Sequence, residues 1–89
     1  MNRTKHPSPS VLFIHDGVSF EAHRKHLSDA GLRVSDTLAG AAVAEAARLQ
    51  PDIIVLDFAC DGGVTAQLKS YAPTRHIPII AFVDLARTL

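Results

Sequence analysis

The stretch Pro51-Asp52-Ile53-Ile54-Val55-Leu56-Asp57 decides the fold. Four consecutive apolar residues, three of them β-branched, end on a carboxylate. A run of this kind is typical of a strand that is buried on both faces, as in a parallel sheet. Ligands of open parallel sheets bind at the carboxyl ends of the strands, so Asp57 lies where a functional carboxylate is expected.

Working outward from this strand, the sequence predicts three more strands. Residues 11–14 and 77–83 are apolar runs, whereas residues 32–35 are more polar, as in an edge strand. Helices are predicted between the strands, over about residues 20–30, 40–49 and 64–71. The order β-α-β-α-β-α-β predicts an α/β fold, with a parallel sheet and helices on both of its faces.

The length, charge and cysteine content of the sequence limit the function classes. The 89 residues suit one domain, which we place at 11–89, after a disordered lead-in at 1–10 that is rich in Pro and Ser. Nine basic and nine acidic side chains cancel, so no basic surface for nucleic acid is expected. The single cysteine, Cys60, excludes an internal disulfide. Because no signal peptide or membrane-length apolar run is visible, we expect a soluble, cytoplasmic protein with no membrane partner.

Two of the predicted strands end in carboxylates, Asp16 and Asp57. If the strands are neighbours, these groups meet at one sheet edge, where a cation would relieve their repulsion. Magnesium takes oxygen ligands, often one or two carboxylates together with several waters. Asp57 could then act as a nucleophile and become an acyl phosphate. The alternative is that both aspartates merely terminate strands, where such residues are common.

Four motifs in order carry a family resemblance. They are Val11-Leu12-Phe13-Ile14-His15-Asp16-Gly17, then Leu38-Ala39-Gly40 with the stretch 51–57, then Asp61-Gly62, and last His76-Ile77-Pro78-Ile79-Ile80-Ala81-Phe82. Together they resemble the receiver domains of response regulators, over about residues 10–84. The resemblance implies a flavodoxin-like fold with strand order 2-1-3-4-5. It also implies a signalling domain in a two-component phosphorelay, not an enzyme, that takes a phosphoryl group from a sensor histidine kinase with magnesium bound.

The resemblance assigns roles to three residues. Asp57 would be the phosphoacceptor and a magnesium ligand, and Asp16 would be a direct carboxylate ligand of the metal. The backbone carbonyl of Ala59, two residues past the acceptor, would be a further ligand.

The sequence departs from the family pattern in four ways. His15 replaces the first residue of the acidic pair, and a protonated imidazole there would repel magnesium. Val83 replaces a Thr or Ser whose hydroxyl donates to the phosphoryl group. The loop 58–61 is short and lacks a Met-Pro element, so the Ala59 carbonyl could be misdirected. The printed sequence also lacks the fifth strand with its lysine and the last helix. We therefore expect a truncated, degenerate receiver with impaired phosphotransfer and weak or absent magnesium binding.

The alternatives remain open at this point. One is a pseudo-receiver that binds another signalling protein independently of phosphorylation, and another is an inactive truncated fragment. Without a fifth strand, residues 77–83 form a sheet edge that invites dimerisation or strand exchange. His15, His23 and His26 could also suggest a transition-metal site, for which solvated surface histidines are the alternative.

Overall fold

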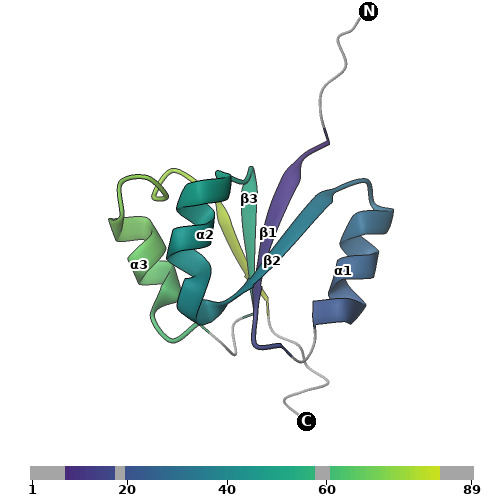
Figure 1. Cartoon of the computed structure of the whole chain (residues 1–89), viewed down its shortest axis with the longest axis horizontal. Coiled ribbons are helices and arrows are strands. Elements are labelled where there is room, and N and C mark those ends of the chain that lie inside the picture. The colour runs from purple at the N-terminus through teal and green to yellow at the C-terminus, as the bar shows by residue number, and fades with distance from the viewer. Residues whose placement is uncertain (1–7, 18–19, 58–60, 83–89) are drawn as a thin grey trace, which may run out of the picture.

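The computed structural model describes residues 8–17, 20–57 and 61–82. The strands are β1 (Ser10–His15), β2 (Arg33–Leu38), β3 (Ile53–Asp57) and β4 (Ile79–Phe82). The helices are α1 (Phe20–Asp29), α2 (Ala42–Leu49) and α3 (Val64–Ser70), with a 3-10 turn η1 (Ala39–Ala41) before α2 (Figure 1). Strands and helices alternate along the chain, as the spacing of the apolar runs predicts.

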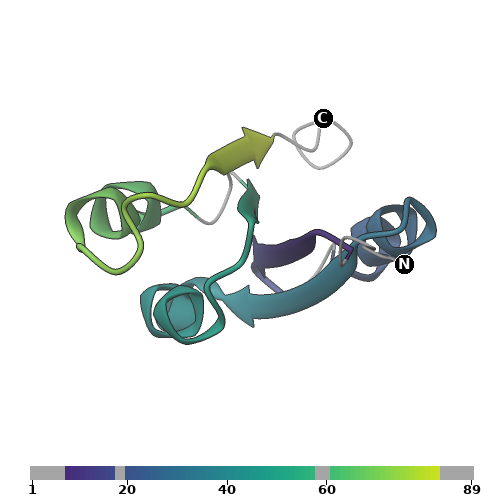
Figure 2. The ribbon, with the colours of Figure 1, turned by 90° about the horizontal axis from the view of Figure 1, so that it is seen from above.

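All four strands pair in parallel, in the order β2-β1-β3-β4. Helix α1 lies on one face of the sheet, and α2 and α3 lie on the other (Figure 2). The protein is thus a small α/β domain with an all-parallel sheet and helices on both faces, which confirms the predicted fold at this level.

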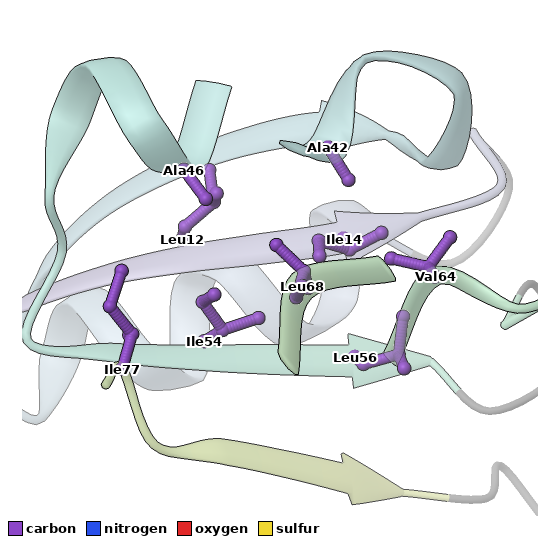
Figure 3. Packing of buried hydrophobic residues seen from close by; sticks show 9 residues of the cluster. All are labelled: Leu12, Ile14, Ala42, Ala46, Ile54, Leu56, Val64, Leu68 and Ile77. Carbon is purple, nitrogen blue, oxygen red and sulfur yellow. The ribbon is translucent and has the colours of Figure 1, made fainter. Parts of the chain in front are cut away.

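The main core lies between the sheet and helices α2 and α3 (Figure 3). Its members are the buried side chains of Leu12, Ile14, Ala42, Ala46, Ile54, Leu56, Val64, Leu68 and Ile77. Side chains of a strand alternate between faces, so Leu12 and Ile14 supply this core from β1, and Ile54 and Leu56 supply it from β3. Helix α2 contributes only alanines to the fully buried set, which lets its backbone approach the sheet closely.

The opposite face carries an aromatic cluster. The ring of Phe13 stacks on that of His23 on α1, with ring centroids 5.7 Å apart, and Phe82 of β4 meets His23 at 4.9 Å. The three residues of this cluster also line a hollow of about 340 Å³ between α1 and β4. Ile80 lines it and is 52% exposed, so this part of the face is not covered within the described residues.

The bounds of three strands differ from the prediction. β1 spans 10–15 rather than 11–14, one residue longer at each end. β2 spans 33–38 rather than 32–35, because its polar residues pair with β1 along its whole length, and Thr37 is buried opposite Ile14. β4 starts at Ile79 rather than at Ile77. The buried Ile77 instead belongs to the preceding connection, where its N–H donates to the carbonyl of Thr74 (3.0 Å).

The connection from α3 to β4 is fixed by side chains that bond to backbone carbonyls. The buried Thr74 hydroxyl donates to the carbonyl of Leu68 at the end of α3 (2.7 Å). Gln50, which ends α2 with a left-handed φ of 47°, donates its amide to the carbonyl of Pro73 (2.8 Å). These bonds position β4 against β3.

The N-terminal prediction overlaps the structure in part. Residues 1–7 of the expected lead-in lie outside the described residues. Ser10 opens β1, and its N–H donates to the Asp52 carboxylate (2.8 Å) at the start of β3. Residues 83–89 of the predicted domain also lie outside the described part of the chain.

Candidate functional site

The carboxyl ends of β1 and β3 form the candidate site. These strands are adjacent and in register, with Ile14 paired to Leu56. The next residue of each strand, His15 and Asp57, therefore comes side by side, and Asp16 follows at the first position after β1. The structure thus brings the two predicted carboxylates to the same edge of the sheet.

Asp57 is buried, with 1% of its surface exposed, and it pairs with Phe82 of β4. Moving a carboxylate out of water is unfavourable unless polar partners compensate. Asp57 is thus a buried carboxylate at the carboxyl end of a strand, where ligands of parallel sheets bind.

Asp16 differs from Asp57 because it is exposed. It begins the turn that leads to α1, and Gly17 follows it with φ of +92°, a conformation that glycine adopts without strain. One carboxylate is thus open to solvent, whereas the other is buried in the sheet.

His15 is buried rather than solvated, and both of its ring nitrogens are hydrogen bonded. The Gly17 N–H donates to Nδ1 (2.8 Å), and Nε2 lies 2.7 Å from Oδ2 of Asp36. Because a backbone N–H can only donate, Nδ1 carries no proton, and Nε2 must be the donor to Asp36. The ring is therefore the neutral Nε2–H tautomer, and the His15–Asp36 contact is a hydrogen bond rather than an ion pair. The positive charge that could repel a cation is not present in this arrangement.

Asp36 is the residue that sequence reasoning missed. It lies on β2 in register with Phe13, and its side chain is 46% exposed. Had β2 been predicted to run to residue 38, alternation would have placed Asp36 on the same face as Val34 and Leu38. That register would have identified a third carboxylate near the edge.

The Asp-Gly motif before α3 is a helix-capping turn. Oδ1 of Asp61 accepts from the N–H of Thr65 (3.0 Å), and its backbone carbonyl accepts from the N–H of Val64 (2.6 Å). Gly62 and Gly63 both have positive φ, which carries the chain into the helix. The motif thus has a structural role at the start of α3.

Magnesium fits the described residues by donor type and number. Asp16 and Asp57 supply two carboxylates, the usual protein contribution to a magnesium site that keeps several waters. The third predicted ligand, the carbonyl of Ala59, lies outside the described residues, as do Cys60 and Val83.

A site for a transition metal is not formed in the described part of the chain, which holds no group of three or more His, Cys, Asp or Glu residues able to bind an ion. The ring of His23 packs in the aromatic cluster, and that of His15 is held by Gly17 and Asp36. Over residues 8–17, 20–57 and 61–82, no helix has the length and apolar character that crossing a membrane requires.

Comparison with known proteins adds no assignment. No family model matches the chain, and no curated protein matches it.

Proposed function

We propose that the chain is a receiver domain of the response-regulator type, with a flavodoxin-like fold, that accepts a phosphoryl group on Asp57. One observation carries this proposal: the strand order β2-β1-β3-β4 brings Asp16 and a buried Asp57 to adjacent strand ends. This order matches the first four positions of the flavodoxin-like order 2-1-3-4-5. A sensor histidine kinase is the proposed phosphodonor.

The proposed chemistry is a phosphoryl transfer to a carboxylate. An oxygen of Asp57 forms a bond to phosphorus while the bond between phosphorus and the donor breaks, and the donor leaves with that electron pair. The product is an acyl phosphate on Asp57. Asp16, Asp57 and the Ala59 carbonyl are the proposed ligands of magnesium, which supplies positive charge opposite the phosphoryl oxygens when it is bound.

The transfer is proposed to be slow. Val83 offers no hydroxyl to the phosphoryl oxygens, whereas the family places a Thr or Ser there. The neutral His15 neither adds a negative charge for the cation nor repels it. Phosphorylation is therefore expected with a reactive small phosphodonor and over long incubation.

Intact-mass spectrometry after incubation with magnesium and acetyl phosphate tests the proposal. The wild type should gain one phosphoryl group, stable in acid and labile in base, and Asp57→Asn should gain none. Asp52→Asn is the matched control, because Asp52 lies at the opposite end of β3 and should not affect the modification. A folded wild type without an adduct, or an adduct that persists in Asp57→Asn, would refute the proposal.

A second candidate function, a phosphorylation-independent interaction module, is favoured by the exposure of β4. Within the described residues β4 pairs only with β3, so its other edge presents unpaired backbone groups beside the exposed Ile80. We propose a second copy of the chain as the partner, paired edge to edge through β4. Sedimentation velocity should show a concentration-dependent dimer that Ile80→Lys weakens. A chain that stays monomeric at high concentration argues against this function.

A further inference from the structure

We propose that Asp36 and His15 form a positioning pair that holds the turn carrying Asp16 in place for a cation. The proposal concerns the same edge and, for its cation, rests on the proposed function. Two bonds connect three segments: Asp36 on β2 accepts from His15 at the end of β1, and His15 accepts from the Gly17 N–H in the turn.

The first step is the orientation of the ring. An imidazole with one acceptor and one donor nitrogen can satisfy both neighbours in only one tautomer and one flip state. The carboxylate of Asp36 selects Nε2–H as the donor, because Oδ2 can only accept. This leaves Nδ1 with its lone pair directed at Gly17. If Asp36 were removed, either tautomer could form, and the Nδ1–H form could no longer accept from Gly17.

The second step is the restraint on the turn. Nδ1 of a histidine lies the same number of bonds from its backbone as Oδ1 of an aspartate, so the bond to the N–H two residues on is the imidazole counterpart of an Asx turn. Such a bond fixes the peptide between Asp16 and Gly17. Gly17 has φ of +92°, and without the bond this residue could adopt many other conformations. The direction of the Asp16 side chain depends on that peptide.

The third step is the link to binding. Hydrogen bonds that orient metal ligands are as much a part of a site as the ligands, and their loss lowers metal affinity by roughly 10- to 100-fold. Asp36 is 46% exposed, so it can be replaced without opening the core. Its contribution can therefore be measured in a folded protein.

Nuclear magnetic resonance on the 89-residue chain tests the proposal. Long-range nitrogen–proton correlations should show His15 with a bare Nδ1 and a protonated Nε2. In Asp36→Ala, the Gly17 amide should exchange with solvent roughly fivefold faster, as the loss of one hydrogen bond predicts. The Ile54 amide, which donates to the Pro78 carbonyl within the sheet, serves as the internal reference and should not change.

Variants of Asp36 distinguish the hydrogen bond that it accepts from the negative charge that it carries. Asp36→Asn keeps an acceptor for Nε2–H and should restore both the Gly17 protection and the magnesium affinity, whereas Asp36→Ala should lower that affinity roughly tenfold. Asp29→Ala removes one exposed acid from α1, where Asp29 pairs with Lys25, and should leave both readouts unchanged. Magnesium binding is followed by titration of the amide shifts near Asp16 and Asp57.

Three results would overturn the proposal: a protonated Nδ1, unchanged Gly17 exchange in Asp36→Ala, or failure of Asp36→Asn to restore protection. If the wild type binds no magnesium but its Gly17 exchange responds as expected, the proposed function fails and the positioning pair stands. The two conclusions are thus distinguished by one set of spectra.

Discussion

Replacement of Thr74 by valine should destabilise the domain by about 2 kcal/mol. The Thr74 side chain is fully buried, and its hydroxyl donates to the Leu68 carbonyl at 2.7 Å. Valine keeps the shape but removes the donor. A typical hydrogen bond contributes a net of roughly 0.5–1.5 kcal/mol, but removal of one partner costs about 1–3 kcal/mol when it leaves a buried carbonyl without a donor. A domain of this size is stable by only roughly 4–13 kcal/mol, so the loss is a large fraction of the total.

Urea denaturation followed by circular dichroism measures this effect. With a slope of about 1 kcal/mol/M, the midpoint should fall by roughly 2 M without a change in slope. Thr74→Ser keeps the hydroxyl and loses one methyl group, so it should cost only about 0.8 kcal/mol. Thr65→Val, on the less buried first turn of α3, should stay within about 0.5 kcal/mol of wild type. Equal losses for Thr74→Val and Thr74→Ser would show that the hydroxyl contributes nothing and would refute the reasoning.

Three further predictions use the same denaturation assay. Gly17→Ala and Gly31→Ala should each cost about 1–2 kcal/mol, because both residues have positive φ, but only Gly17→Ala should also weaken magnesium binding in the titration; equal effects of both on binding would contradict this. Leu68→Ala should cost about 2–5 kcal/mol from the buried core, whereas Leu38→Ala, at an exposed position, should cost less than about 0.5 kcal/mol, and similar losses would contradict the packing described here. Asp61→Ala should cost about 1 kcal/mol through loss of the α3 cap, and Asp61→Asn should recover most of it, since the amide oxygen can still accept from the Thr65 N–H.

The elements that fill the core could be predicted from the sequence, since a strand buried on both faces needs an uninterrupted apolar run. Residues 53–57 form a strand with the predicted bounds, and the first two predicted helices begin within two residues of the observed ones. The parallel arrangement follows from the alternation of elements, since a helix between two strands returns the chain in the same direction.

The contacts between polar side chains could not be predicted in the same way. The His15–Asp36 bond joins residues 21 positions apart, and it exists only in one register of β1 and β2. A shift of one residue would turn Asp36 to the other face of the sheet. The Thr74 bond likewise depends on the path of a connection that contains no periodic pattern. Hydrophobic periodicity constrains which residues are buried, and it leaves polar partners undetermined.

His15 shows how such a contact changes the interpretation of a motif. In the receiver family that we propose for this chain, the position of His15 holds a carboxylate of an acidic pair, so a histidine there would mean one negative charge fewer at the edge. In the structure, the ring is neutral and its Nε2–H donates to the Asp36 carboxylate. A carboxylate on β2 therefore contacts the residue that ends β1. His15 Nδ1 lies two bonds beyond Cβ, where an aspartate has its Oδ1, and it accepts from the Gly17 N–H as that oxygen would. His15 thus holds the turn through Nδ1, and the carboxylate that it contacts, Asp36, lies at the other ring nitrogen. A cation at Asp16 and Asp57 would gain less attraction from Asp36 than from an adjacent carboxylate, because Coulomb energy falls with distance and with exposure to water. Weak cation binding with an intact turn is the combination that this arrangement predicts.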